Sequence, residues 1–198
     1  EAIAAAGFDL LAFDFSYAGE AGTNVSDISV LQEVEDLRCA VDFFKTRCPG
    51  RIHFFGSSMG AAVSILSLSE NPPEALSFAG IATPADLRGL ITGNSAISDL
   101  SLLPAQGYTE LQGIRMNNAF FHEINAIDME AALEKIAVPV LAIHGDNDQV
   151  VPLRNVDIMA GRVSNFTSCI IKNGDHNLVK DDEIRCIQDR LLSWFSSF

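Results

Sequence analysis

Ser58 lies at the centre of the run Gly56-Ser57-Ser58-Met59-Gly60, directly after the short apolar segment 52–55. A serine that attacks acyl groups is held on a sharp turn between a strand and a helix, which leaves its hydroxyl accessible. We expect Gly56 and Gly60 to permit that turn, because neither carries a side chain. The backbone N–H of Met59, at the start of the next helix, would face a developing oxyanion that the helix dipole also stabilises. The pattern indicates acyl transfer at Ser58.

Two further loops carry the partners that such a serine needs. Asp148 lies in HGDNDQVVP (144–152) after the apolar run 138–144, and His176 lies in NGDHN (173–177) after the run 168–172. A histidine accepts the serine proton, and a carboxylate holds the imidazole in the correct tautomer. Because all three residues follow expected strands, the sequence predicts a catalytic triad with Ser58 as nucleophile, His176 as base and Asp148 as the orienting acid.

Each of these residues also has a structural interpretation. Ser58 could be an ordinary helix N-cap, since serine is frequent there. Asp146 is an alternative acid, although its position favours a role in the turn, whereas Asp148 directly precedes the loop exit. Asp175 is expected to be a loop residue. The remaining histidines are expected to be structural, and His122-Glu123 lacks the second histidine of a zinc motif.

The spacing of apolar residues predicts an α/β protein. Short apolar runs alternate with amphipathic segments, a pattern typical of parallel strands joined by helices. Expected strands cover 9–15, 52–55, 76–82, 138–144 and 168–172, and expected helices cover 1–6, 27–47, 60–70, 128–136 and 181–198. The segment 83–136 is too long for a simple connection, so we interpret it as a small cap inserted into a single domain that spans residues 1–198.

Composition excludes several classes of partner. The chain has 198 residues, 48% of them hydrophobic, which is enough for a sizeable core, and a formal net charge of −13. That charge disfavours nucleic acid and anionic membrane surfaces. No apolar run is long enough for a membrane span, and no signal peptide is visible. The four cysteines form no metal-binding pattern and are expected to be free thiols, which suits a cytoplasmic protein.

Four runs resemble α/β-hydrolases of the serine esterase type, particularly cinnamoyl and feruloyl esterases: FDFSYAGEAG (13–22), GSSMG (56–60), PVLAIHGDNDQVVP (139–152) and GDHN (174–177). The resemblance implies an α/β-hydrolase fold, with a mainly parallel sheet, helices on both faces and a helical cap. It also implies hydrolysis of small acyl or aryl esters through an acyl-enzyme, without a metal or organic cofactor. A peptidase or thioesterase remains an alternative, as does a noncatalytic protein of the same fold that binds a ligand or partner.

The resemblance also implies a gap in the sheet. In these hydrolases a further strand lies between those that correspond to 9–15 and 52–55. The loop after that strand supplies the second oxyanion donor. Unpaired buried backbone groups each cost about 1–3 kcal/mol, so such a gap is hard to sustain. We therefore hypothesise that the sequence is incomplete at its N-terminus or is completed by another segment.

Overall fold

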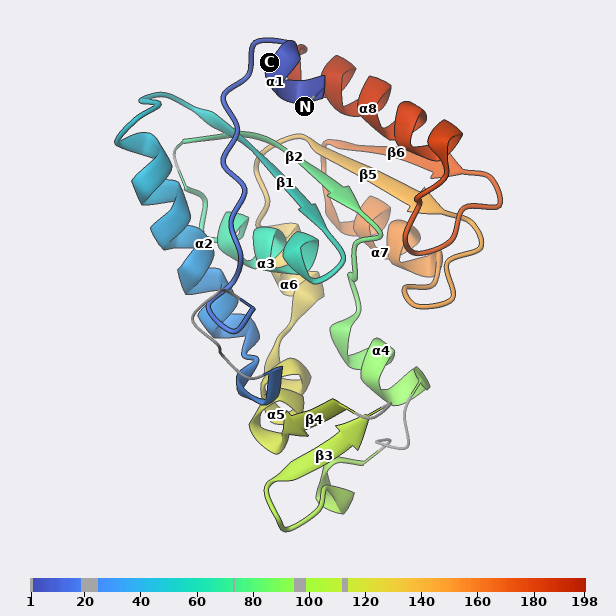
Figure 1. Cartoon of the computed structure of the whole chain (residues 1–198). Helices are drawn as coiled ribbons and strands as arrows, with labels where there is room; N and C mark the ends of the chain where they lie inside the picture. Colours follow the sequence, from blue (N-terminus) through green and yellow to red (C-terminus); the bar gives the residue numbers. More distant parts are fainter. Residues whose placement is uncertain (1, 19–24, 73, 95–98, 112–113) are drawn as a thin grey trace.

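A four-stranded parallel sheet forms the centre of the computed structural model, which describes residues 2–18, 25–72, 74–94, 99–111 and 114–198 (Figure 1). The strand order is β1-β2-β5-β6. The strands are β1 (Ile52–Ser57), β2 (Ala75–Ile81), β5 (Val140–Gly145) and β6 (Phe166–Ile171). Because all four are parallel, their C-terminal ends meet at one edge of the sheet, where such folds bind ligands.

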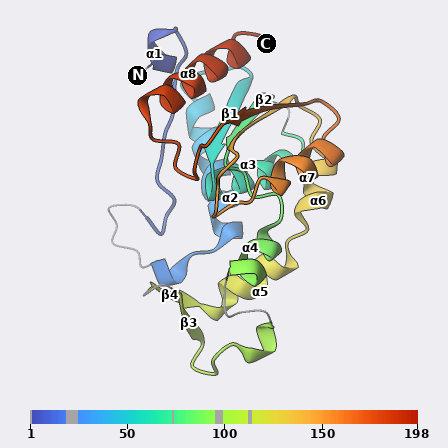
Figure 2. The ribbon, with the colours of Figure 1, turned by 90° about the vertical axis from the view of Figure 1, so that its right-hand side faces the viewer.

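Helices cover both faces of this sheet (Figure 2). The short α1 (Ala2–Ala5) and the long α8 (Asp181–Phe195) lie on one face. The opposite face is covered by α2 (Val30–Lys45), α3 (Met59–Leu68), α6 (Met129–Glu134) and α7 (Arg154–Arg162). None of the helices in the described ranges is long and apolar enough to cross a membrane.

The central strands bury side chains on both faces, as their continuous apolar runs require. Phe78 and Val140 belong to the core beneath α2 and α3. Their neighbours Ala79 and Leu141 belong to a second core beneath α8. All six residues of β5 are buried. The alternation of strand side chains therefore builds two cores, one for each layer of helices.

The segment between β2 and β5 forms the lower lobe in Figure 1. It contains α4 (Leu87–Asn94), a 3-10 turn (Leu100–Leu102), the antiparallel pair β3 (Tyr108–Leu111) and β4 (Ile114–Asn117), and α5 (Asn118–Ala126). Glu123 of α5 accepts hydrogen bonds from the Ser29 hydroxyl at 2.8 Å and the Leu31 N–H at 2.8 Å. The Glu123 carboxylate thus fastens this lobe to the N-terminus of α2, where the helix dipole favours negative charge.

The sequence predicted the fold class, which is confirmed, and four of the five strands to within two residues or so of their bounds. The prediction of a strand at 9–15 is wrong, because these residues are extended but pair with no strand of the described chain. The sequence analysis did not predict α4, the β3–β4 hairpin or α7, and it treated 117–128 as a loop where the structure has helix α5. Within the predicted cap 83–136, α6 packs against the sheet-covering helices, since Met129, Ala132 and Leu133 are buried in the core beneath α3. Residues 19–22 of the run 13–22 lie outside the described residues.

Candidate active site

Ser58 occupies the sharp turn between β1 and α3, with backbone angles φ 51° and ψ −120°. A positive φ is uncommon for a residue with a side chain and costs on the order of 1–3 kcal/mol. The Ser58 side chain makes no capping hydrogen bond to α3, although the residue occupies the N-cap position. Its hydroxyl is therefore not used as a helix cap.

The two glycines of the turn differ in their steric requirement. A Cβ atom at Gly56 would lie 2.5 Å from the carbonyl oxygen of Gly60, which no side chain can tolerate. A Cβ atom at Gly60 would meet no atom within 4 Å. The close approach of β1 to the first turn of α3 thus requires glycine at 56. The expectation that the turn needs glycine at both positions is wrong for Gly60, where open space is present.

His176 reaches the serine from the loop between β6 and α8. Its Nε2 atom lies 3.1 Å from Ser58 Oγ, and its Nδ1 atom lies 2.9 Å from Asp148 Oδ2. The structure therefore brings together the three residues that the sequence assigned to a triad. The arrangement requires Nδ1 to carry the proton that it donates to Asp148, which leaves Nε2 free to accept the serine proton.

Asp148 is held by three hydrogen bonds, two from backbone N–H groups and one from His176. Its side chain is fully buried, and Oδ1 accepts the N–H groups of Val150 and Val151, both at 2.8 Å. His144 Nε2 lies 3.5 Å from Oδ2, but its hydrogen bond goes to the Val151 carbonyl oxygen at 2.8 Å. The three bonds to Asp148 fix the carboxylate in the position from which Oδ2 can orient the imidazole.

The other acids of the two loops have different partners. Asp146 Oδ1 accepts the Asn173 N–H at 2.5 Å and so joins the loop after β5 to the loop after β6. Asp175 accepts the N–H groups of Asn177 at 2.9 Å and Leu178 at 3.1 Å, and these bonds lower the pKa of its carboxyl. None of these three bonds involves His176, so both acids act in the turns that position it.

Two buried polar residues support the site. His144 is 1% exposed, and its Nε2 lies 2.8 Å from the Val151 carbonyl oxygen, which fixes the turn that follows β5. Asn155 was not singled out from the sequence. It is fully buried, accepts the N–H groups of Ala85 at 2.9 Å and Asp86 at 3.0 Å, and donates to Pro152 O at 2.8 Å. Asn155 thereby ties the loop after β2 to the loop after β5.

Met59 is the first residue of α3, so its N–H has no acceptor within that helix. This is the one oxyanion donor that the sequence assigned within the chain. In the described ranges, no group of three or more His, Cys, Asp or Glu side chains is placed to hold a metal ion.

Solved structures with the same architecture are numerous. Est1E from Butyrivibrio proteoclasticus with bound ferulic acid superposes with a TM-score of 0.77 at 16% identity, over 87% of this chain and 70% of the other. The chain has the α/β-hydrolase fold. The esterase PF2001 from Pyrococcus furiosus gives a TM-score of 0.71 at 22% identity, over 99% and 72% of the two chains. Mouse α/β-hydrolase domain-containing protein 10 gives 0.71 at 21% identity, over 93% and 76%.

No protein-family model matches the sequence, and no curated protein matches it significantly. The structural similarity therefore establishes the α/β-hydrolase fold, and several of the proteins that share it are esterases or other hydrolases. The fold accounts for the placement of Ser58, Asp148 and His176, because each follows the C-terminal end of a parallel strand.

Proposed function

We propose that the protein is a serine hydrolase that cleaves carboxylic esters of small acyl or aryl groups. The observation that carries this proposal is the continuous line of contacts from Ser58 Oγ through His176 to the buried Asp148 carboxylate, at 3.1 Å and 2.9 Å. Both distances are within hydrogen-bonding range. An activated serine with an adjacent base oriented by a third group has the arrangement expected for acyl transfer.

In this reaction Ser58 Oγ attacks the ester carbonyl while its proton passes to His176 Nε2. Asp148 stabilises the imidazolium that forms. The tetrahedral intermediate collapses as His176 returns the proton to the leaving alcohol oxygen. Water then attacks the acyl-Ser58 ester by the same route, which releases the acid and restores the serine. General-base catalysis contributes about 10²–10⁴-fold and an oxyanion donor about 10²–10³-fold.

Support for a carboxylic ester as substrate comes from two directions. Several proteins that share the fold are esterases, and one was solved with ferulic acid bound. The lobe between β2 and β5 follows the C-terminal end of β2, at the sheet edge where Ser58 lies. The same triad serves thioesters and peptides, so the acyl and leaving groups are set by the surrounding pocket and not by the triad.

Labelling with a fluorophosphonate tests the proposal directly. Such a reagent phosphonylates an activated serine with loss of fluoride, so the wild-type chain should gain one adduct. Ser58→Ala should abolish the adduct, whereas Ser57→Ala, which removes the neighbouring hydroxyl, should retain it. Absence of labelling in a folded sample contradicts the proposal. Hydrolysis of p-nitrophenyl esters of increasing chain length, methyl ferulate and an aminoacyl anilide then assigns the substrate class.

A noncatalytic role in ligand or partner binding is the second candidate. One observation favours it: β1, the strand that leads to Ser58, has an unpaired edge in the described part of the chain. In that case the Ser58 turn would keep its geometry next to the unpaired edge of β1 but would not catalyse hydrolysis at a measurable rate. A well-folded chain that takes up no fluorophosphonate would support this candidate.

We also propose a reducing compartment such as the cytoplasm as the site of action. Cys39, Cys48, Cys169 and Cys186 are all free thiols, as expected for proteins in such compartments. Alkylation of the native protein in freshly lysed cells should modify thiols before any reductant is added. Recovery of a disulfide-linked form instead would contradict this placement.

A further inference from the structure

Two of the four cysteines meet between the sheet and the last helix. Cys169 belongs to β6 and Cys186 to α8, and both pack against the core beneath α8. Cys169 projects from the same face of β6 as Ile171, two residues further on, because side chains alternate along a strand. Both thiols are free and half-buried. The pair therefore joins an edge strand of the described sheet to the helix that covers it.

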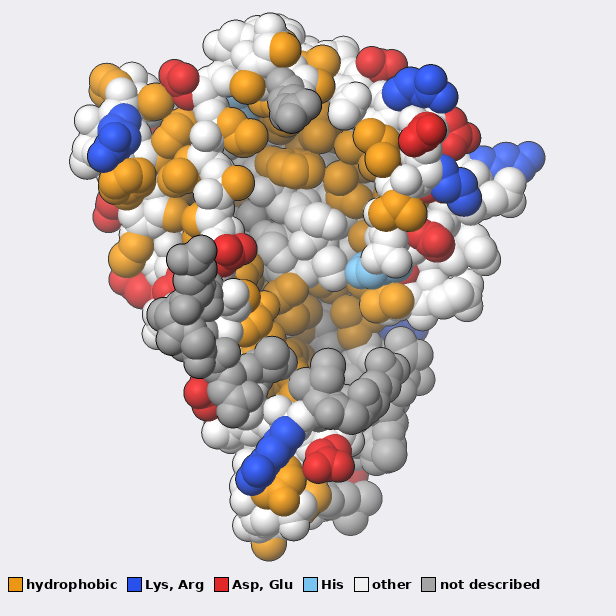
Figure 3. Space-filling view, viewed as in Figure 1, with side chains coloured by type: hydrophobic (Ala, Val, Ile, Leu, Met, Phe, Trp, Pro, Cys, Tyr) orange, Lys and Arg blue, Asp and Glu red, His pale blue; other side chains and the backbone are white. Residues whose placement is uncertain are grey.

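A cation accompanies this pair of thiols. The Cys186 side chain and the Arg190 guanidinium both interact with the Cys169 thiol. Arg190 follows Cys186 by one turn of α8, so the two side chains lie on one face of the helix. Burial and the neighbouring Cys186 raise the pKa of the Cys169 thiol, and Arg190 acts in the opposite direction by stabilising the thiolate. Figure 3 shows basic side chains among acidic ones over the surface where α8 lies in Figure 1.

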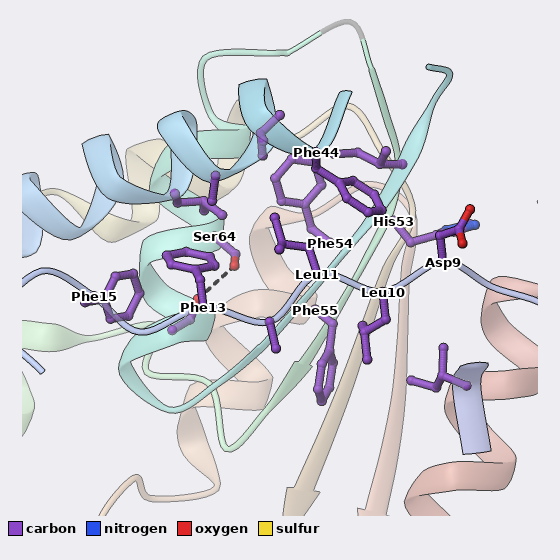
Figure 4. Close-up of a pocket in the computed structure, with 17 residues that line it drawn as sticks. Asp9, Leu10, Leu11, Phe13, Phe15, Phe44, His53, Phe54, Phe55 and Ser64 are labelled. Atoms are coloured by element: carbon purple, nitrogen blue, oxygen red, sulfur yellow. Dashed lines mark hydrogen bonds between the residues drawn. The ribbon is translucent and has the colours of Figure 1, made fainter. Parts of the chain in front are cut away.

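The other two cysteines have different surroundings. Cys39 is exposed on α2. Cys48 Sγ donates to Asp9 Oδ2 at 3.4 Å, and partial burial together with this carboxylate raises the pKa of the Cys48 thiol. Figure 4 shows Asp9 next to His53, at one end of the segment 9–15. A negative neighbour opposes the thiolate, so Cys48 serves as an internal control for the Cys169–Cys186 pair.

Two neighbouring thiols complete a reaction that a single thiol cannot. A single thiol that attacks a small disulfide stops at a mixed disulfide, whereas a second thiol within reach displaces the small molecule and closes a bond inside the protein. A metal ion fits less well, because no group of three or more His, Cys, Asp or Glu side chains in the described residues is placed to hold one. The pair and its cation therefore indicate thiol–disulfide exchange.

We propose that Cys169 and Cys186 form a reversible modification site that reacts with small disulfides, such as oxidised glutathione, and closes into a bond that ties α8 to β6. The dithiol is the resting form, in keeping with the reducing compartment proposed above. Because His176 lies between the two cysteines in the chain, the bond closes a loop that contains it. The reaction does not use Ser58 and does not depend on the proposed hydrolysis.

The modification consists of two exchanges. The Cys186 thiolate attacks one sulfur of oxidised glutathione, whose S–S bond breaks and releases one glutathione thiolate. The Cys169 thiolate then attacks Cys186 Sγ in the mixed disulfide, which releases the second glutathione thiolate and forms the internal bond. The protons of both protein thiols pass to the released glutathione, and two electrons pass from the protein to glutathione. The first attack falls to Cys186 because the raised pKa keeps Cys169 protonated.

Mass spectrometry after oxidation tests the proposal. The 198-residue chain is incubated with oxidised glutathione, quenched with acid and alkylated without reductant. Two of its four cysteines should resist alkylation, and tryptic digestion should yield a cross-link between peptides 163–172 and 186–190, which contain Cys169 and Cys186. Dithiothreitol should restore all four thiols. The Ser58→Ala chain should give the same cross-link, which separates this site from the proposed hydrolysis.

Matched serine variants assign the bond to the pair. Cys169→Ser and Cys186→Ser should each abolish the internal bond, whereas Cys39→Ser and Cys48→Ser should retain it. Oxidation of the wild-type chain should raise its melting temperature by roughly 5–10 °C, because the closed loop restricts the unfolded chain. The same treatment should leave the melting temperature of Cys169→Ser unchanged.

The role of the cation is tested by the rate of closure. Arg190→Gln removes the positive charge beside Cys169, so it should slow closure several-fold and let the mixed disulfide accumulate. Arg185→Gln removes an exposed charge of the same helix and should leave the rate within about twofold. Equal rates in the two variants would remove Arg190 from the site.

Three results would overturn the proposal. Glutathione adducts on the folded chain without an internal bond would show that the two sulfurs cannot close. A bond that forms only in urea would show that the native fold keeps the thiols apart or out of reach of the reagent. A cross-link that involves Cys39 or Cys48 would assign the exchange to other thiols.

Discussion

The two sides of the central sheet support the candidate active site very differently. Strand β5 pairs with neighbours on both edges, buries all six of its residues and ends at the loop of Asp148. Strand β1 pairs on one edge, leaves Phe55 44% exposed and ends at Ser58. The acid thus follows a strand that is paired on both edges, while the nucleophile follows β1 at one edge of the described sheet and the base follows β6 at the other.

The same contrast appears in two buried carboxyl groups. Asp148, on the β5 side, accepts two backbone N–H groups and contacts His176. Glu33 of α2, on the β1 side, is 1% exposed, and within the described part of the chain the Tyr17 hydroxyl lies near its carboxyl group without a hydrogen bond of normal geometry. Burial raises the pKa of Glu33 to about 7, and the neighbouring Tyr17 hydroxyl acts in the opposite direction. Backbone hydrogen bonds thus hold the carboxylate that faces His176, whereas in the described chain the Glu33 carboxyl group receives none.

The largest effect on kcat/KM should come from replacing the Asp148 carboxylate by an amide. Asp148→Asn should lower kcat/KM for a p-nitrophenyl ester about 10³–10⁴-fold, because the amide no longer stabilises the imidazolium or fixes its tautomer. Asp146→Asn, two residues away in the same loop, should lower kcat/KM less than about tenfold. In the described chain the Asp146 side chain accepts a hydrogen bond from the Asn173 N–H and none from His176. Equal losses in the two variants would contradict the assignment of the acid.

Truncation of a side chain should lower the free energy of unfolding more in β5 than in β1. Ile143→Ala in β5 removes a fully buried side chain and should cost about 2–5 kcal/mol of the free energy of unfolding. Phe55→Ala in β1 removes more atoms but should cost at most about 1.5 kcal/mol, because nearly half of that side chain already contacts solvent. Urea unfolding monitored by circular dichroism measures both. A loss of unfolding free energy at Phe55 larger than about 1.5 kcal/mol would show that other atoms cover the Phe55 side chain in solution.

Glu33 should make the free energy of unfolding depend on pH. Its folded pKa of about 7 lies above the unfolded value of 4.5, so its contribution is fully present below pH 4.5 and is lost as the pH rises through 7. Between pH 5 and 8 the loss should be about 2–3 kcal/mol. Glu33→Gln should remove that loss from the urea-unfolding profile. Glu35→Gln, at an exposed position of the same helix, should preserve it, and a flat wild-type profile would show that Glu33 has a partner in solution.

How much of this could be predicted from the sequence depended on whether the signal was local. A few consecutive residues were enough to predict the strand before His144 and the loops that carry Asp148 and His176. Their meeting in space could also be predicted, because a parallel sheet brings the C-terminal ends of its strands together. Residues 9–15 read as a strand because the run is apolar, but a strand exists only where a neighbour pairs with it. Asn155 gave no signal, since the N–H groups that it accepts lie 69 and 70 residues away in the chain.

The smallest effect should come from the helical glycines that follow the two strands. A Cβ atom at Gly60 of α3 or at Gly161 of α7 would meet nothing within 4 Å. Replacing glycine by alanine in a helix stabilises it by about 0.5–1 kcal/mol. Gly60→Ala and Gly161→Ala should therefore raise the urea midpoint by similar amounts. If Gly161→Ala stabilises the protein and Gly60→Ala does not, the first turn of α3 needs its glycine for a reason other than space. The turn of Ser58 after β1 would then tolerate less change than the helix that follows the Asp148 loop after β5.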